Sequence, residues 1–484
     1  MKVLRLPAVI QLSEAKRKLL QNYLEGKPAQ PGVASSPIIP SASKEATPLA
    51  ICQEQLFLRE TSRPVIPPLY NECIQLRMAG TLNVLALEQS LAEIIRRHEI
   101  WRTSYVVKNG QPLQVIHPAT DPVRLPMIDL QGLSPTKQEE EVLNIIKDLL
   151  ERPFNLSDGP LWKARLIKLG HLEHRLYLIA HLSIVDGVSV YQVFPTELAA
   201  LYRAHASGWP SALPAASVQF RDYASWQRLR WRGSEVGKQF DYWRMQLGGE
   251  IPPLNWPSDR PRPAKETFRG AIQPFVLATP EAAKGLSRQA GSTLFVTLLA
   301  LFASLLHIYT GQDDFLIGTP SPAGRKRSEV QKLLGYFLNP VALRFRLTRK
   351  TTFRDLLRQA HRLTLEALSN DDVPLEILAR ELNMKADPSR NPFFTVAISL
   401  QPRMPKLNLN WSVTSMDISS GGAPWDLYLA FIDAPEGMMG RAQYNPDLFE
   451  TESIVRMLGH YQQLLEIAST NPDRRLSEIQ LPSD

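Results

Sequence analysis

Two stretches of this chain alternate between helix-like and strand-like hydrophobic patterns, and this repetition constrains the fold more than any other feature. The first stretch runs over residues 48–216 and the second over residues 268–484. Residues 217–267 separate them with an aromatic and basic segment followed by closely spaced prolines, which favour an extended crossover. A chain of 484 residues exceeds one ordinary hydrophobic core. The pattern therefore predicts the α/β class, with two sandwich-like lobes of similar size.

Hydrophobic spacing also predicts individual elements inside each lobe. In the first lobe, an apolar strand over Leu176–Ala180 ends at His181. A helix over Val188–Tyr202 follows, and Pro195 inside it is expected to bend it. In the second lobe an apolar helix begins at Ser292 or Thr293 and closes at Gly311. The remaining periodic segments predict helices over residues 85–97, 353–368 and 451–468, and strands over residues 113–117, 161–169, 315–318, 341–347 and 394–400.

Residues 1–47 form an appendage outside the two lobes. Ser13 is a suitable cap for an amphipathic helix from Glu14 to Glu25, and Gly26 is a suitable stop for it. The residues that follow are rich in Pro, Ser and Ala, which is linker composition. The segment over residues 12–26 fits either a docking helix for an upstream partner or a fragment of an interdomain connector.

Composition and charge exclude several classes of function. The formal net charge of +7 comes from dispersed basic residues without a recognisable nucleic-acid module, so nucleic acid is not an expected partner. The longest apolar run, Leu294–Leu306, is too short to span a bilayer, and no membrane association is expected. The start of the chain lacks a signal peptide, so a cytoplasmic location is expected. The two cysteines, Cys52 and Cys73, support neither a disulfide framework nor a thiolate metal site.

The seven residues from His181 to Gly187 carry the candidate chemistry. A histidine at a strand end, followed by a turn with an aspartate and a glycine, is a common setting for acyl transfer. The next position, where a second histidine would act as base, holds Leu182, which has no titratable proton. A coenzyme A-dependent transferase, with a histidine and an aspartate separated by three residues, would need its histidine at the same position. From the residues alone, His181 fits a hydrogen-bonded core residue, and Asp186 fits a buried structural carboxylate.

Several motifs, taken in order, resemble those of the condensation domains of nonribosomal peptide synthetases. The resemblance runs from about residue 48 to the C-terminus, and the His181–Gly187 segment stands in the place of the active-site motif. The opening motif departs from the family pattern, because Gln55 stands where an arginine is usual. The other matching motifs cover residues 97–105, 220–226, 334–339, 370–376 and 387–392.

This resemblance implies a fold, partners and a reaction. The fold would be two chloramphenicol acetyltransferase-like α/β sandwich lobes forming a V-shaped pseudo-dimer, with the active site in a tunnel between them. Donor and acceptor carrier proteins would approach from opposite faces, each with a phosphopantetheine arm. The donor's acyl or peptidyl thioester would pass to the acceptor's amine to form an amide. The domain itself would bind no metal and no cofactor.

The resemblance also implies roles for residues of the motif. The family normally has two adjacent histidines, and Leu182 stands in place of the second, which is the chemically placed imidazole. His181 matches the first histidine, whose role is mainly architectural. Asp186 would pair with an arginine of the other lobe, for which Arg325 is the candidate. Gly187 would let the chain pass tightly beneath the tunnel floor.

Three further residues are candidates for the wall of the tunnel. Ser183 is adjacent to the motif leucine. Asn339 lies in a family motif, although a loop asparagine that caps its own turn fits equally well. Trp425 either faces the tunnel or packs in the core.

Three functional hypotheses remain open from the sequence. In the first, a deliberate exchange of the second histidine for Leu182 impairs a condensation domain. In the second, the chain is a non-catalytic relative that serves as a gate, a spacer or a recruitment platform for carrier proteins or a tailoring enzyme. In the third, an active domain tolerates the leucine, because orientation of the two arms supplies much of the rate.

Overall fold

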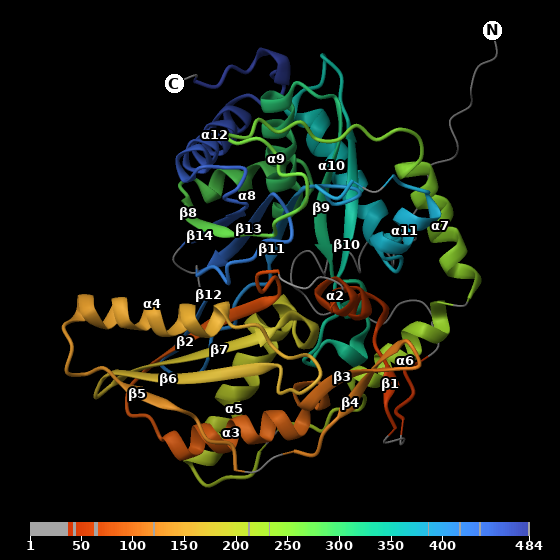
Figure 1. Ribbon diagram of the computed structural model, residues 1–484. Coiled ribbons are helices and arrows are strands. Elements are labelled where there is room, and N and C mark those ends of the chain that lie inside the picture. The colour runs from red at the N-terminus through yellow and green to blue at the C-terminus, as the bar shows by residue number, and fades with distance from the viewer. Residues whose placement is uncertain are drawn as a thin grey trace.

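The structure, a computed structural model, places the chain in two lobes that lie one above the other in Figure 1. It describes residues 37–41, 45–61, 66–119, 122–211, 213–231, 233–385, 387–415, 418–434 and 437–482. The helix expected over residues 12–26 lies outside these described residues. Each lobe has its own buried apolar core. The expected α/β class, with two lobes, is confirmed.

The N-terminal lobe is built on one mixed sheet with helices on both faces. Its strands are β2 (Asn71–Ala79), β5 (Met127–Asp129), β6 (Trp162–Gly170), β7 (Glu173–His181) and β12 (Trp411–Ser415), and its helices are α3 (Val84–Arg97), α4 (Pro135–Glu151) and α5 (Phe194–Ala206). Within the described residues the strand order is β12-β2-β7-β6-β5, antiparallel except for the β5–β6 pair. Figure 1 shows α4 on one face and α3 and α5 on the other. This sheet positions the candidate motif, since β7 ends at His181.

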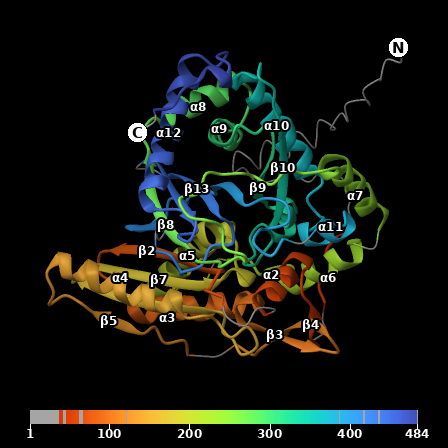
Figure 2. The same cartoon turned by 45° about the horizontal axis from the view of Figure 1, so that its top comes forward.

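The C-terminal lobe is built on a second mixed sheet. Its strands are β8 (Ala271–Leu277), β9 (Asp314–Ser321), β10 (Asn339–Arg346), β11 (Val396–Gln401), β13 (Leu427–Ala434) and β14 (Gly437–Tyr444), and its helices are α8 (Pro280–Gln289), α9 (Leu294–Thr310), α10 (Phe353–Ser369) and α12 (Thr451–Thr470). The strand order over the described part of the chain is β10-β9-β11-β13-β14-β8, and β11 runs parallel to both of its neighbours. The apolar helix α9 packs against α8, α10 and α12, as Figure 2 shows.

The remaining elements are shorter and lie outside the two main sheets. They are β1 (Thr47–Pro48), β3 (Thr103–Lys108) and β4 (Gln111–Ile116), which form a small sheet, and α2 (Ile51–Thr61), α6 (Phe220–Trp231), α7 (Ser234–Leu247) and α11 (Leu375–Glu381). The aromatic and basic part of the predicted crossover therefore forms α6 and α7. The proline-rich part, over residues 250–263, contains neither helix nor strand, in agreement with an extended crossover.

Strand β12 crosses from one lobe to the other. It belongs to the second half of the chain, but it pairs antiparallel with β2, with Trp411 opposite Met78 and Ser415 opposite Ile74. The linear division that assigned residues 268–484 to the C-terminal lobe needs correction here. A strand edge with unpaired backbone groups is satisfied by any matching strand, whatever its position in the sequence.

Local signals explain the two ends of one helix and the irregular course of another. The Thr293 hydroxyl accepts a hydrogen bond from the Val296 amide at 3.3 Å, and Gly311 closes α9 with φ of 66°, so the predicted ends of this helix are confirmed. The helix predicted over Val188–Tyr202 is also present, since the chain is helical from residue 187 to residue 206. Its first part is a wider, π-helical turn over Ser189–Val193 that continues directly into α5, and Pro195 lies in the first turn of α5. Proline has no amide to donate, so the changed hydrogen-bond pattern of the wider turn accommodates Pro195 inside the helix.

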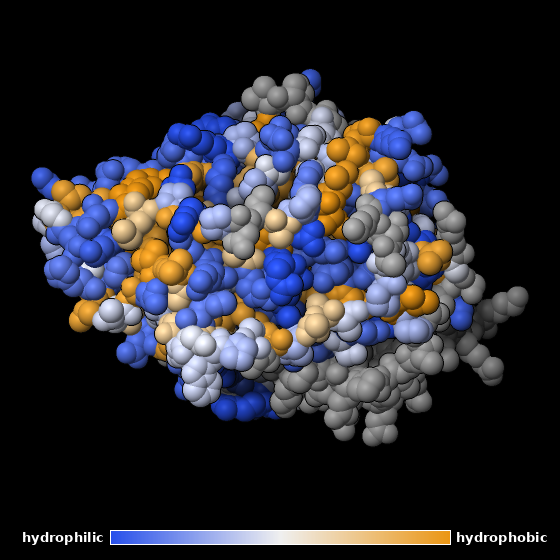
Figure 3. All heavy atoms as spheres, turned by 90° about the horizontal axis from the view of Figure 1, so that it is seen from below, coloured by the Kyte–Doolittle hydropathy of each residue, from blue (hydrophilic) through white to orange (hydrophobic). Residues whose placement is uncertain are grey.

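The surface and the helix lengths add two observations. Seen from below, hydrophobic residues on this face are interspersed with hydrophilic ones (Figure 3). Among the described residues, no single helix is long and apolar enough to cross a membrane, and only the α8–α9 pair, bent by 105°, has the required length and composition together.

Candidate active site

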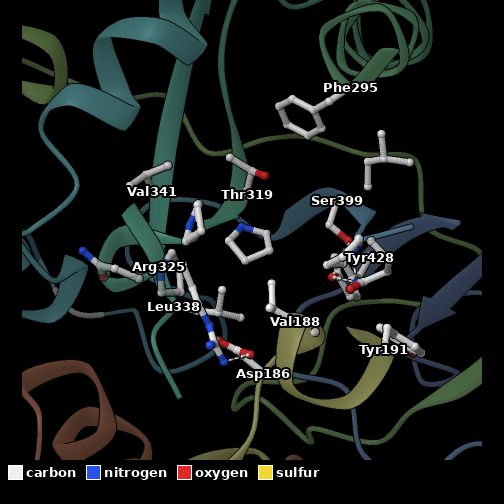
Figure 4. A pocket seen from close by; sticks show the side chains of 18 of the residues that line it. Asp186, Val188, Tyr191, Phe295, Thr319, Arg325, Leu338, Val341, Ser399 and Tyr428 are labelled. Atoms are coloured by element: carbon white, nitrogen blue, oxygen red, sulfur yellow. Dashed lines mark hydrogen bonds and ion pairs between the residues drawn. The ribbon is translucent and has the colours of Figure 1, made fainter. Parts of the chain in front are cut away.

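A large cavity of about 1080 Å³ lies between the two lobes, and residues of both lobes line it. The N-terminal lobe contributes the end of the His181–Gly187 segment and the turn after it, and Figure 4 shows Asp186, Val188 and Tyr191 on this side. From the C-terminal lobe, Figure 4 labels Phe295, Thr319, Leu338, Val341, Ser399 and Tyr428. The candidate motif thus faces a space in which two substrates can meet.

Asp186 and Arg325 form a buried ion pair between the lobes. The Nη2 and Nε atoms of Arg325 donate to the two carboxylate oxygens at 2.7 and 2.9 Å, a bidentate arrangement. Only 1% of Asp186 and 3% of Arg325 is exposed. Arg325 also donates through Nη1 to the carbonyls of Val330 and Leu333, and through Nη2 to the Ser189 hydroxyl. These bonds satisfy the buried guanidinium and hold the floor of the cavity to the C-terminal lobe.

His181 is buried and does not line the cavity. Its Nδ1 lies 2.7 Å from the Ser183 hydroxyl, and its Nε2 lies 2.6 Å from a carboxylate oxygen of Glu60 on α2. The rings of Tyr70 and Phe154 meet it edge to face. With both ring nitrogens engaged inside the N-terminal lobe, His181 ties β7 to α2 and has no nitrogen left for a substrate.

Leu182 does line the cavity, and its surroundings are apolar. Its backbone amide donates to the Tyr70 carbonyl at 2.7 Å, which fixes the direction of its side chain. The side chain packs, with Ile66 and Leu338, on a small apolar cluster between the lobes. That cluster consists of Cys52, Leu56, Leu69, Tyr70, Phe268 and Tyr336. The cavity-facing position of the motif is thus occupied by a hydrocarbon side chain.

Gly187 lies where a segment of the other lobe passes close by. A β-carbon at this position would lie 2.7 Å from Oε1 of Gln401 and 3.3 Å from Cδ of Pro402, at the end of β11. Gln401 in turn donates to the Ser399 hydroxyl at 3.1 Å, and this hydroxyl lies 2.6 Å from the Tyr428 hydroxyl. Glycine therefore permits a close approach between the motif and a polar network on the C-terminal lobe.

Of the three residues expected in the tunnel wall, two line the cavity and one does not. Asn339 and Trp425 line it. The Asn339 amide also donates to the carbonyls of Asp371 and Val373, at 2.7 and 3.0 Å, which holds a loop of the same lobe. Ser183 needs correction: it is 1% exposed, and its hydroxyl accepts from Tyr105 at 3.0 Å inside the N-terminal lobe. Beyond the end of strand β7, successive side chains point in different directions, and the side chain of Leu182 is the one that faces the cavity.

Several residues of the site were not found from the sequence. Glu60 orients His181, but no spacing relates the two. Tyr70 lies beside Leu182, and its hydroxyl accepts from Arg59 at 3.4 Å, while burial raises the pKa of Tyr70 and keeps it protonated. His361, on α10, is the one histidine among the described residues that line the cavity. It belongs to an amphipathic helix, and nothing in its local sequence distinguishes it from a surface residue.

The rim of the cavity carries charge. Glu72 and Arg441 lie 3.5 Å apart, and Lys284 lies 3.1 Å from Asp433. Two further lining residues, Arg288 and Arg403, are exposed. Arg288 lies near the end of α8, and Arg403 lies just beyond β11.

Comparison with known proteins matches most of the chain to one family. The family model described as "Condensation domain" matches residues 44–484. A linear gramicidin synthase of Brevibacillus parabrevis is 37% identical over 473 residues, which is 96% of this chain and only 6% of the synthase chain. Bacitracin synthase 3 of Bacillus licheniformis is 32% identical over 455 residues, which is 92% of this chain and 7% of that synthase. The chain therefore spans a small part of the length of these relatives.

Solved structures show the same fold. The complex of the X-domain and OxyB from teicoplanin biosynthesis contains a chain that matches with a TM-score of 0.78 and 26% identity, covering 94% of this chain and all of that one. The first condensation domain of the CDA synthetase matches with a TM-score of 0.79 and 20% identity, covering 91% of this chain and 99% of that one. The second likeness concerns the fold alone.

Proposed function

This chain belongs to the condensation-domain family of nonribosomal peptide synthetases, and from that premise we propose that it joins two carrier-bound substrates through an amide bond. The acceptor amine attacks the carbonyl carbon of the donor thioester. A C–N bond forms, the C–S bond breaks, the donor arm leaves as a thiol, and the amine gives up one proton. The interlobe cavity supports this proposal, since about 1080 Å³ is at the upper end of the range for enclosed substrate sites.

Two exposed arginines that line the cavity suit carrier-bound substrates. A phosphopantetheine arm is long, thin and carries a phosphate near its attachment point. Arg288 and Arg403 both line the cavity and are exposed. An exposed cation attracts such a phosphate without having to be desolvated. In this proposal the two arms enter beside these arginines and meet near the Asp186–Gly187 turn.

The observation that carries the proposal is the placement of the two motif residues His181 and Leu182. Leu182 faces the cavity, while His181 is withdrawn with both ring nitrogens bonded. A leucine side chain neither accepts the amine proton nor stabilises the developing charge. Orientation of the two arms then supplies the rate enhancement that remains. We therefore propose an intact condensation site whose proton-handling step is impaired.

The experiment is single-turnover condensation with a loaded donor carrier and a loaded acceptor carrier, followed by intact-protein mass. Leu182→His should raise the rate of amide formation by about 10²- to 10⁴-fold, the usual contribution of a positioned acid–base group. Leu338→His is the matched control, because Leu338 lines the same cavity and packs on the same cluster but lies outside the motif. Equal rates for the wild type and Leu182→His would refute the impairment.

A second function is favoured by two observations. The first is the apolar residue at the catalytic position, and the second is the likeness to the X-domain that is seen in complex with OxyB. In this alternative the chain recruits carrier proteins or a tailoring enzyme without catalysis. No product from either the wild type or Leu182→His, with carrier binding intact by calorimetry, would favour this recruitment function over condensation.

A further inference from the structure

One wall of the cavity carries polar groups that the proposed reaction does not use. It lies on α9 and α10, which pack against each other in the C-terminal lobe. We call it the α9–α10 wall, and it consists of Ser292, Phe295, His361, Thr364, Leu365 and Leu368, all of which line the cavity. Three of these side chains are polar, and three are apolar.

His361 presents a neutral imidazole to this part of the cavity. Its Nδ1 lies 3.0 Å from the Ser292 hydroxyl, just before the start of α9. Burial lowers the pKa of His361, so the ring is neutral at physiological pH. A neutral imidazole has one donor nitrogen and one acceptor nitrogen. Within the part of the chain that the structure describes, Nε2 has no hydrogen-bond partner, so it is available to a ligand.

Thr364, one helical turn further along α10, does not offer its hydroxyl to the cavity. The residue is 2% exposed, and its Oγ1 is buried without a hydrogen-bond partner among the described residues. A ligand in the cavity therefore does not reach this oxygen, and His361 is left as the hydrogen-bonding group of α10 in the wall.

The wall is also uncharged. Burial is the only cause of the lowered pKa of His361, so no charged side chain acts strongly on it. Of the charged residues of α8 that line the cavity, Lys284 pairs with Asp433, and Arg288 is exposed to solvent. A charged group placed against this wall would lose its hydration without gaining a counter-ion, which is costly. An uncharged polar group would gain hydrogen bonds.

We propose that the α9–α10 wall binds an uncharged polar substrate side chain, a hydroxyl or carboxamide on an apolar stem, with His361 as its hydrogen-bonding partner. Phe295, Leu365 and Leu368 pack against the stem. This inference rests on the proposed function, because it concerns the side chain of an amino acid that a carrier delivers to the cavity. It assigns the substrate class by the ring nitrogen of His361 that has no partner in the wall.

The test uses pantetheine amides of leucine, asparagine and aspartate, which have nearly the same shape and cannot be hydrolysed as thioesters. Each is prepared with a free amine, as an acceptor mimic, and with an acetylated amine, as a donor mimic. Binding to the full chain is measured by titration calorimetry. For one of the two forms, asparagine should bind about fivefold more tightly than leucine, as expected for one or two net hydrogen bonds. Aspartate should bind at least about tenfold more weakly than asparagine.

Two variants assign the preference to the wall. His361→Phe should bring asparagine binding down to the level of leucine and leave leucine binding within about twofold of the wild type. Thr364→Val removes a hydroxyl that the ligand does not reach and is the matched control that should retain the preference. Thermal unfolding of each variant checks that the fold is intact.

The outcomes separate this inference from the proposed function. Equal binding of asparagine and leucine, tightest binding of aspartate, or an unchanged preference in His361→Phe would overturn the inference and leave the proposed function standing. Failure of every pantetheine amide to bind would overturn both, since the cavity would not be a carrier-substrate site.

Discussion

The carboxylate of Asp186 in the N-terminal lobe receives two hydrogen bonds, of 2.7 and 2.9 Å, from the guanidinium of Arg325 in the C-terminal lobe. The two residues lie 139 positions apart in the chain, and both are buried. The ring of Phe337 packs against the same guanidinium, with its centre 4.2 Å away. The candidate active site therefore lies at the interface between the two lobes, each of which has its own apolar core.

Removal of one partner of this ion pair should destabilise the whole protein. Asp186→Ala leaves the Arg325 guanidinium buried without its counter-ion, and we expect a loss of about 3–5 kcal/mol in the free energy of unfolding. The measurement is urea denaturation followed by tryptophan fluorescence. The matched control is Glu366→Gln, which removes the exposed Arg362–Glu366 pair on α10 and should cost less than about 1 kcal/mol.

The double variant Asp186→Leu with Arg325→Met gives a sharper check of the same argument. It removes both charges and fills the space with apolar atoms, so it should regain most of the stability that Asp186→Ala loses. A double variant as unstable as the single one would show that the loss came from packing and not from the unpaired charge.

His181 should contribute to stability and not to the chemical step. His181→Ala removes the bonds to Ser183 and Glu60 and leaves a space beside Tyr70 and Phe154, so we expect a loss of about 2–4 kcal/mol. Leu182→Ala, the control at the neighbouring half-buried position, should lose less. Chemical denaturation of both variants gives the comparison. If His181→Ala kept its stability and lost only product formation, a direct catalytic role would follow.

The stability of the protein should depend on the size of the side chain at position 187, because this position lies against the other lobe. In Gly187→Ala the new methyl group lies 2.7 Å from Oε1 of Gln401, so this side chain must move, and we expect a cost of about 1–2 kcal/mol. Adding Gln401→Ala should recover part of this cost, and a double-mutant cycle of unfolding free energies measures the coupling. If the effects of the two substitutions on the free energy of unfolding simply add, the strain does not come from the contact between residues 187 and 401.

The buried His361 should make stability depend on pH in the acidic range. Burial lowers its pKa in the folded state, so below the unfolded-state pKa of about 6.5 the unfolded chain binds a proton that the folded chain resists. Its contribution to stability is therefore present above about pH 6.5 and is lost as the pH falls. His361→Phe should lose less stability than the wild type between about pH 7 and pH 5, measured by urea denaturation at each pH. A steeper loss in the variant would contradict the stated cause.

Much of the secondary structure follows from the sequence because it depends on neighbours along the chain. The apolar strand that ends at His181 and the helix closed by Gly311 both agree with the structure. The helix over Val188–Tyr202 agrees as well, but hydrophobic spacing does not reveal the wider turn that precedes Pro195. The passage of β12 into the other lobe was also beyond the sequence, because strand pairing is decided by available edges.

The residues of the candidate site also divide into those that the sequence predicted and those that only the structure revealed. The motif, its leucine and the pairing of Asp186 with Arg325 could be named before the structure, since the resemblance to a family supplied their order. Ser183 was placed wrongly, because the side on which a residue emerges at the end of a strand depends on what packs there, here Tyr105. His361 was missed, because a histidine on an amphipathic helix is identified as a cavity residue only by the helix opposite it.

The sequence by itself determined the α/β class, the two lobes and the presence of a leucine at the position of the second motif histidine, since all three depend on residue order and spacing. Only the tertiary structure decided that this leucine faces the cavity while His181 is withdrawn, and that His361 and Thr364 line the cavity from the other lobe. The physical reason is that side-chain direction and hydrogen-bond partners are set by packing between segments that lie far apart in the chain.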